Sequence, residues 1–275
     1  MSKLIPKDAH AMIIGAMKCG TSSLFNYLSS HPEICPSITK EPEFFSDMQS
    51  HGVNVTSYSE LFNFDEAKHK YTLDGSTGYT KYPIEKDVPK KIFEYGISPK
   101  IIYIIRNPFE RIQSHYSHMQ RWSKWKPDIL DKQLIDTCNY FLQLEQFKKY
   151  FSTSDILILD FDELKADPDS VLKKVYDFLD LSHDYFPNNY EIKNQTRPLS
   201  KADFIINKLE SDKELLWIPK TLKHALTQTL QKLLPKKARK LTETEMKFLH
   251  NELKDSMLKL NDVYGFDVRK WGFND

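Results

Sequence analysis

Residues 15–24, with the sequence GAMKCGTSSL, combine two glycines, a lysine and three consecutive hydroxyl side chains. A short apolar run precedes them, and Leu24, Phe25 and Leu28 follow at helical spacing, which predicts a strand, a turn and a helix. Such a turn points backbone N–H groups inward beside the positive end of a helix, so it suits phosphate or sulfate oxygens. Lys18 would add a full charge. A plain tight turn would explain the glycines but not Lys18 or the hydroxyls.

This segment departs from the nucleotide-binding pattern GxxxxGK followed by Ser or Thr. Gly15 and Gly20 keep the spacing, but Thr21 occupies the lysine position and Lys18 lies inside the loop. A nucleotide kinase places that lysine on the β- and γ-phosphates and the next hydroxyl on Mg²⁺. The altered position therefore favours a shorter anion that is transferred without a metal ion.

A second candidate anion site follows the apolar run 101–105. Arg106 comes directly after this run, and Ser114 follows eight residues later, near the first turns of the next predicted helix. Open parallel sheets bind ligands at the carboxyl ends of their strands, and a guanidinium suits bidentate phosphate binding. Arg106 could instead pair with an acid, but two anion motifs at neighbouring strand ends favour binding.

A candidate general base lies in residues 37–46, with the sequence SITKEPEFFS. Glu41 and Glu43 stand beside two phenylalanines, and Lys40 precedes them. A carboxylate in such surroundings, near an anionic donor, has a raised pKa and can accept the proton of an attacking group. Taken alone, Glu41 would be interpreted as a solvated loop acid.

These segments resemble those of the sulfotransferases that use 3′-phosphoadenosine 5′-phosphosulfate (PAPS), especially the heparan sulfate and related bacterial enzymes. The resemblance implies that the loop holds the 5′-phosphosulfate and that Arg106 and Ser114 bind the 3′-phosphate. It also implies that Glu41 is the general base, with Glu43 as second candidate, and that Lys40 neutralises the transferred group. The loop residues assigned to the donor are Lys18, Gly20, Thr21, Ser22 and Ser23.

Two later segments extend the resemblance. Residues 194–201, NQTRPLSK, resemble the family's late loop that closes over the donor, where Arg197 and Lys201 would hold the adenosine phosphates; an ordinary surface turn is an equal alternative. Residues 74–79, DGSTGY, resemble a substrate segment more loosely. Gly75 stands where heparan-type enzymes carry a lysine that faces the acidic polysaccharide, which disfavours a highly sulfated glycan.

The predicted function is in-line transfer of the sulfuryl group of PAPS to a hydroxyl or amine, with Glu41 removing the proton and PAP as product. The acceptor is a small molecule or a glycan; lipids and peptides also fit a glutamate base. No metal is expected, because His115 and His118 have no third ligand at suitable spacing. The alternatives are a P-loop kinase of a small metabolite and a catalytically inactive nucleotide-binding protein, which would not need Glu41.

The elements that position these residues alternate between apolar strands and amphipathic helices. Strands are expected at 11–14, 71–73, 101–105 and 156–159, and helices at 22–30 and 170–179. Nearly continuous apolar strands in this alternation indicate a parallel sheet covered on both faces. The sequence predicts one P-loop-like α/β domain over residues 1–275, with a helical part from about residue 202 packed on it.

The last third is predicted to be helical. Leucines mark one face of a helix over 219–234, and Thr242 with Glu245 forms a capping box that opens a second helix. The apolar face of the second helix is formed by Met246, Leu249, Leu253, Met257 and Leu260. Residues 218–240 contain seven lysines and arginines and no acid, which indicates a solvated basic face or a rim that attracts an anionic ligand.

Composition excludes several classes of protein. Lysine and arginine number 39 against 38 aspartates and glutamates, so the net charge of +1 provides no field for a nucleic acid. Three cysteines without a CxxC pair argue against a disulfide framework and favour a reducing compartment. The apolar run 11–17 ends at Lys18 and is too short for a signal peptide or a membrane span, so a cytoplasmic protein is expected.

Overall fold

The computed structural model describes residues 5–47, 55–122, 127–190, 229 and 239–274. Within these ranges, five parallel strands form one sheet in the order β2-β3-β1-β4-β5. The strands are β1 (His10–Gly15), β2 (Ile34–Pro36), β3 (Tyr71–Asp74), β4 (Lys100–Ile105) and β5 (Ile156–Asp160). The predicted parallel α/β sheet is therefore confirmed.

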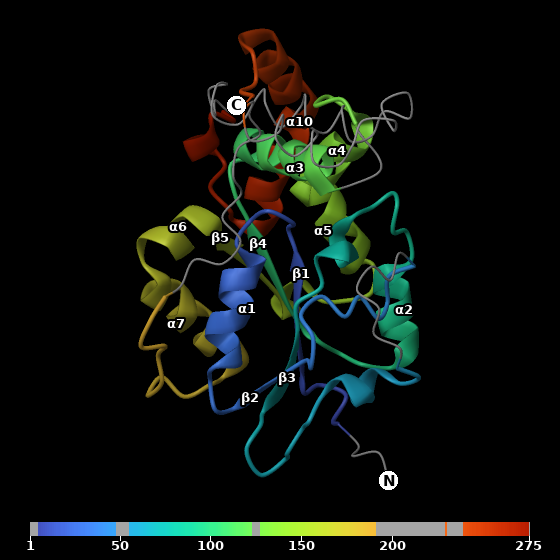
Figure 1. Cartoon of the computed structure of the whole chain (residues 1–275), viewed down its shortest axis with the longest axis vertical. Coiled ribbons are helices and arrows are strands. Elements are labelled where there is room, and N and C mark those ends of the chain that lie inside the picture. Colours follow the sequence, from blue (N-terminus) through green and yellow to red (C-terminus); the bar gives the residue numbers. More distant parts are fainter. Residues whose placement is uncertain (1–4, 48–54, 123–126, 191–228, 230–238, 275) are drawn as a thin grey trace.

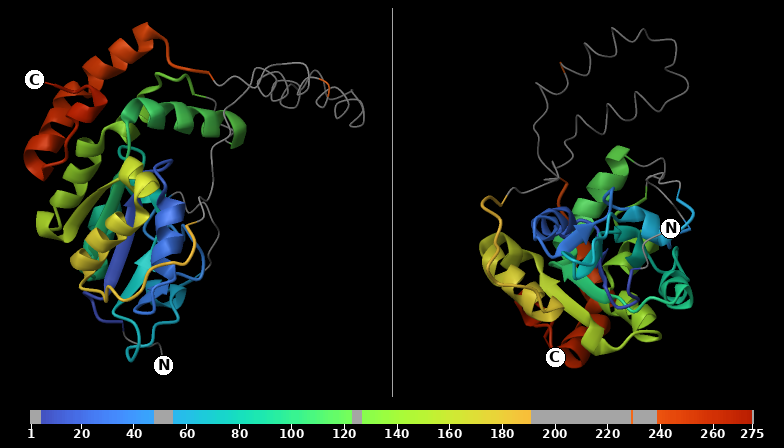
Figure 2. Two further views of the ribbon diagram at one scale, coloured as in Figure 1. Left: turned by 90° about the vertical axis from the view of Figure 1, so that its left-hand side faces the viewer. Right: turned by 90° about the horizontal axis from the view of Figure 1, so that it is seen from below.

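Helices connect the strands and cover the sheet. The α-helices are α1 (Thr21–Ser29), α2 (Val88–Tyr95), α3 (Pro108–Trp122), α4 (Lys132–Cys138), α5 (Tyr140–Lys148), α6 (Phe161–Ala166), α7 (Pro168–Leu179) and α10 (Glu243–Tyr264). Short 3₁₀ helices are η1 (Tyr58–Leu61), η2 (Thr77–Thr80), η3 (Thr153–Asp155) and η5 (Arg269–Trp271). Figures 1 and 2 show α1, α6 and α7 along one side of the sheet, and α3, α4 and α10 beyond the carboxyl ends of the strands.

The two central strands are the most deeply buried. All six residues of β1 are buried, and Ile101 to Ile105 in β4 have no exposed surface. Both faces of these strands are covered by helices, which is why their sequences are apolar without alternation. Strand β2 was not predicted, because three residues that include Pro36 carry almost no periodic signal.

The C-terminal segment packs against the same domain. Thr242 caps α10 with the predicted capping box, and the Phe273 ring stacks on Phe109 of α3 at 5.7 Å between ring centroids. The expected apolar face of α10 is buried except at Met246, which is 41% exposed, so that part of the prediction was wrong. Met246 lies in the first turn, just before the helix reaches the core.

Some predictions fall outside the described residues. The expected helix over 219–234 and most of the basic stretch 218–240 lie there, and the helical part expected from about residue 202 is described only at 229 and from 239 onward. Among the described helices, none is long and apolar enough to cross a membrane.

Candidate active site

The site lies where the chain leaves two adjacent central strands. Gly15 at the end of β1 pairs in register with Tyr103 of β4, and the Ala16 N–H donates to the Ile104 carbonyl at 2.7 Å. From β1 the chain continues to β2 and β3 on one side of that strand, whereas β4 and β5 lie on the other side of β1. Ligands bind at such points of divergence, because the loops leave a crevice at the carboxyl edge.

The loop after β1 has the conformation of an anion-binding turn. Lys18 and Gly20 both adopt positive φ angles, 71° and 83°, and the Cys19 N–H donates to the Ala16 carbonyl at 3.1 Å. Gly20 is the N-cap of α1, and no side chain caps that helix end. A Cβ on Gly20 would come within 2.6 Å of the Phe161 ring, so glycine is required here for both conformation and space.

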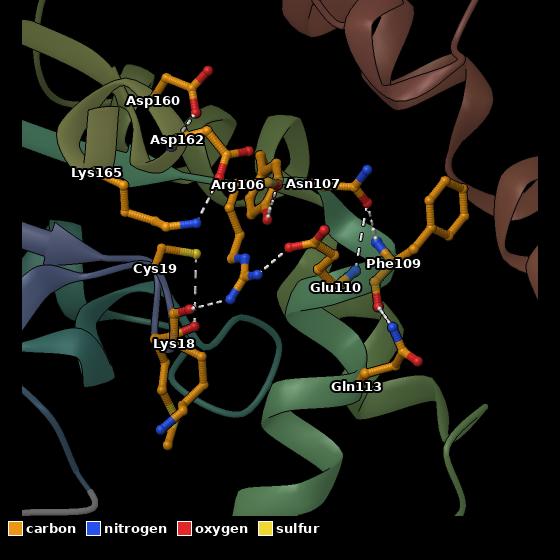
Figure 3. Close-up of polar contacts among 12 residues, drawn as sticks. Lys18, Cys19, Arg106, Asn107, Phe109, Glu110, Gln113, Asp160, Asp162 and Lys165 are labelled. Atoms are coloured by element: carbon orange, nitrogen blue, oxygen red, sulfur yellow. Dashed lines mark hydrogen bonds and ion pairs between the residues drawn. The ribbon is translucent and has the colours of Figure 1, made fainter. Parts of the chain in front are cut away.

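Lys18 interacts electrostatically with the candidate base Glu41. Burial lowers the pKa of the Lys18 ammonium, and the charge of Glu41 opposes this shift. In Figure 3 the Lys18 carbonyl faces Arg106, while its side chain extends away from that guanidinium. The loop thus presents the Lys18 backbone to Arg106, while the Lys18 ammonium and the Glu41 carboxylate interact through their charges.

Arg106 joins the two predicted anion motifs. Its Nη1 donates to the Lys18 carbonyl at 3.5 Å, and the guanidinium lies over the Phe161 ring at 4.9 Å from the centroid. Arg106 also pairs with Glu110, one turn into α3, as the alternative interpretation of this residue proposed. Glu110 is exposed, so this pair is weak and can yield to an incoming anion. Ser114 lies on α3, one turn beyond Glu110, and is half-buried.

Glu41 is held by contacts to both of its carboxylate oxygens. Lys40 Nζ contacts Oε1 at 2.5 Å, and Thr77 Oγ1 donates to Oε2 at 3.1 Å. The residue has a φ of 60°, a conformation that surrounding contacts must maintain. Its side chain is 24% exposed, so the carboxylate can still meet a ligand. Thr77 was not singled out from the sequence, because the contact joins residues 36 positions apart.

Glu43, the second candidate base, has different surroundings. It is 1% exposed, its Oε1 accepts from the Gly78 N–H at 2.8 Å, and its own N–H donates to Ser76 Oγ at 2.9 Å. A Cβ on Gly78 would come within 1.9 Å of Glu43 Oε2. Glu43 therefore fastens the segment before η2, and its burial separates it from any acceptor in the crevice.

A buried polar cluster supports the same segment. Asp74, at the end of β3, accepts hydrogen bonds from Tyr58 at 3.0 Å, Tyr79 at 2.8 Å and Ser76 at 2.6 Å. Burial raises the pKa of Asp74 to about 6, although these three donors act in the opposite direction. Tyr79 is buried, as expected of a core aromatic. The cluster fixes the chain between β3 and η2, and Thr77 is the first residue of η2.

His118 on α3 interacts electrostatically with residues of the site. Burial lowers the pKa of His118 to about 4; Lys18, Lys81 and Arg121 also lower it, while Glu41 opposes them. His118 therefore lies within electrostatic reach of both Lys18 and Glu41, on the helix that follows Arg106. The sequence gave no indication of this, since Lys18 and Glu41 are far from His118 along the chain. Among the described residues, no three His, Cys, Asp or Glu side chains form a group that could hold a metal ion.

Two predicted donor residues are not placed. Arg197 and Lys201 lie outside the described residues, as does the rest of the segment 194–201. Of the remaining predicted residues, Arg106 contacts the loop at the Lys18 carbonyl, Lys40 contacts Glu41, and the charges of Lys18 and Glu41 interact.

The chain belongs to the sulfotransferase family, because the model of the sulfotransferase domain matches residues 8–202. Heparan sulfate glucosamine 3-O-sulfotransferase 5 of Homo sapiens is 28% identical over 195 residues, which are 65% of this chain and 55% of that protein. Heparan sulfate glucosamine 3-O-sulfotransferase 3A1 of Mus musculus is 30% identical over 200 residues, 66% of this chain and 47% of that protein. The chain thus spans about half the length of these relatives.

A solved structure shows the same fold over nearly the whole chain. A sulfotransferase from Alicyclobacillus acidocaldarius superposes with a TM-score of 0.68 at 19% identity, covering 97% of this chain and 99% of that one. The family match places the chain in the sulfotransferase family, and the shared fold agrees with its single parallel α/β domain.

Proposed function

We propose that this sulfotransferase transfers the sulfuryl group of PAPS to a hydroxyl or amine of an acceptor, with Glu41 as the general base. The observation that carries the proposal is the contact of Arg106 with the Lys18 carbonyl in the loop, together with the charge interaction between Lys18 and Glu41. Cations on one side would bind a multiply charged donor, and a carboxylate opposite would receive a proton.

The donor would bind along residues 15–23, the phosphate loop. The N–H groups at the start of α1, with Lys18 and the side chains of Thr21, Ser22 and Ser23, would hold the 5′-phosphosulfate. Arg106 and Ser114 would hold the 3′-phosphate from the start of α3, and Arg197 and Lys201 would close over the nucleotide. Glu110 would then release Arg106 to the ligand.

In the proposed step, an acceptor oxygen or nitrogen attacks the sulfur of PAPS. A bond forms between that atom and sulfur, while the bond between sulfur and the bridging oxygen of the 5′-phosphate breaks. The electron pair remains on the phosphate of PAP, where Lys18 and the N–H groups stabilise the charge. Glu41 takes the proton of the acceptor, and Lys40 moves from Glu41 to the transferred group.

The proposed acceptor is a glycan, because the relatives named above act on heparan sulfate glucosamine. A Cβ added at Gly75 would come within 2.6 Å of the Phe25 ring, so the position has no room for a lysine. It therefore offers no cation to a sulfated chain. The acceptor is therefore expected to carry fewer sulfates than heparan sulfate. A reducing, cytoplasmic location is part of the proposal, and Cys19, Cys35 and Cys138 are buried thiols.

A thermal-shift titration tests donor use. PAP should raise the melting temperature without Mg²⁺, whereas ADP and ATP with Mg²⁺ should have little effect. A Mg²⁺-dependent response to ATP would instead identify a kinase, and the absence of any response to PAP would reject the proposal. Labelled PAPS incubated with a panel of glycans, lipids, peptides and small alcohols then identifies the acceptor; PAP binding without any transfer would indicate an inactive nucleotide-binding protein.

A further inference from the structure

Arg111 is a buried cation that lies directly behind the phosphate loop. It occupies the second turn of α3 and is 1% exposed. Its Nε donates to the Met17 carbonyl at 3.1 Å, and its Nη1 lies 2.8 Å from Cys138 Sγ and 3.4 Å from Thr137 Oγ1. The guanidinium also lies over the Tyr140 ring at 5.9 Å from the centroid. None of these partners is the anion that a buried arginine normally requires.

The groups around Arg111 are neutral near pH 7. Burial raises the pKa of Cys138, raises that of Cys19 to about 11, and raises that of Tyr140 well above its ordinary value. No carboxylate pairs with Arg111 within the described part of the chain. A guanidinium stays protonated in proteins, so a full positive charge is held here without a counter-ion among the described residues.

The contact with Met17 also orients the loop. In a trans peptide the C=O and N–H point in opposite directions, so a Met17 carbonyl aimed at Arg111 turns the Lys18 N–H to the other side. Arg106 holds the next carbonyl, that of Lys18. The two arginines therefore hold consecutive loop carbonyls and keep these oxygens from facing an anion in the turn.

We infer that Arg111 is a positioning residue whose uncompensated buried charge finds its counter-ion in the anionic group of the donor bound in the loop. This inference rests on the proposed function. In the low-dielectric interior the charge acts over several ångströms, whereas a surface lysine would be screened. Without the donor the charge is a cost to the fold, and with the donor bound it contributes to affinity.

Cys138 offers a test in which stability and affinity change in opposite directions. Cys138→Asp places a carboxylate beside Arg111, and Cys138→Asn is the neutral control of matched size. Without ligand, the Asp variant should melt at a higher temperature than the Asn variant, because the buried cation is then paired. The Kd of the Asp variant for PAP should be about tenfold higher than that of the Asn variant, because the new carboxylate already neutralises Arg111. Equal PAP affinity in the two variants would refute the inference, since a purely structural role for Arg111 predicts that result.

Arg111→Met provides a second, independent test, with the exposed Arg269→Met as control. The Arg111 variant should lose most of the PAP-induced rise in melting temperature, whereas the Arg269 variant should keep it. If the Arg111→Met variant binds PAP with unchanged affinity, the inference is overturned, even if the Asp variant does not fold. If the unaltered protein does not bind PAP, the proposed function fails; inorganic phosphate then replaces PAP in the same comparison and tests the charge by itself.

Discussion

The donor side and the base side of this site are held in place by different kinds of contact. The donor side, residues 15–23 with Arg106 and Arg111, is tied to the two most buried strands through backbone hydrogen bonds such as Ala16 N–H to Ile104 C=O. The base side, residues 40–43 with 74–80, is joined by side-chain contacts between two segments outside the central strands. Substitutions on the donor side should therefore change its charge and leave its backbone in place. Substitutions on the base side should change its geometry.

The largest effect is expected on the donor side. Lys18→Met should lower turnover by about 10³ and weaken PAP binding, because in the proposed reaction the ammonium stabilises charge on the leaving phosphate. The shape of the loop should persist, since Gly20 and the Ala16 contact maintain it. Single-turnover transfer from labelled PAPS measures the loss. The exposed Lys132→Met is the matched control and should be unaffected; equal activity of the two variants would contradict the role of Lys18.

The next effect distinguishes the two glutamates of the base side. Glu41→Gln should lower turnover by about 10² or more with similar PAP affinity, because proton removal is lost while the donor contacts remain. Glu43→Gln keeps an oxygen that can accept from the Gly78 N–H, so turnover should change little. Steady-state rates and PAP titration of both variants measure the difference. A large loss in the Glu43 variant alone would exchange the two roles.

Thr77→Val should produce a smaller effect, a loss of about tenfold in kcat with little change in the KM for PAPS. Removing the hydroxyl takes away a donor to the ionised Glu41, so the pKa of the base rises and the acidic limb of the pH–rate profile moves to higher pH. Thr77→Ser keeps the donor and should restore the original profile. An unshifted limb in the Val variant would mean that Thr77 does not orient the base.

The last effect concerns stability, and not activity, on the base side. The pKa of Asp74 rises from 3.8 when unfolded to about 6 when folded, because the carboxylate is buried. The folded state therefore binds more protons between these values, and stability falls as pH rises from about 4 to 6, by at most about 3 kcal/mol. Thermal melts across this range should show the slope, and Asp74→Asn should flatten it. A slope unchanged by the substitution would assign it to another group.

The sequence predicted the strand, turn and helix of the donor side, because each of these elements is local. A strand, a glycine-bounded turn and a helix follow one another within residues 10–29, and each leaves a signal in its own composition. Arg106 was placed correctly at a strand end for the same reason. The sequence analysis took the two anion motifs to lie at neighbouring strand ends, and β1 and β4 are neighbours in the sheet.

The base side was predicted less completely. Glu41 and Glu43 are two residues apart with the same side chain, and only the fold shows that one is half-exposed and the other buried. Thr77 and His118 approach Glu41 from distant parts of the chain, and no periodicity records such contacts. Short 3₁₀ turns such as η2 also have weak sequence signals.

By itself, the sequence determined the class of fold, the phosphate loop and the cations that would serve it. These depend on hydrophobic periodicity, on glycine at a positive φ and on charge, all of which are properties of neighbouring residues. Only the tertiary structure decided which glutamate is accessible, and that Arg111 is a buried charge and not a surface cation. The free energy of a charged group is set by its burial and its pairing, and both depend on segments that meet only in the folded chain.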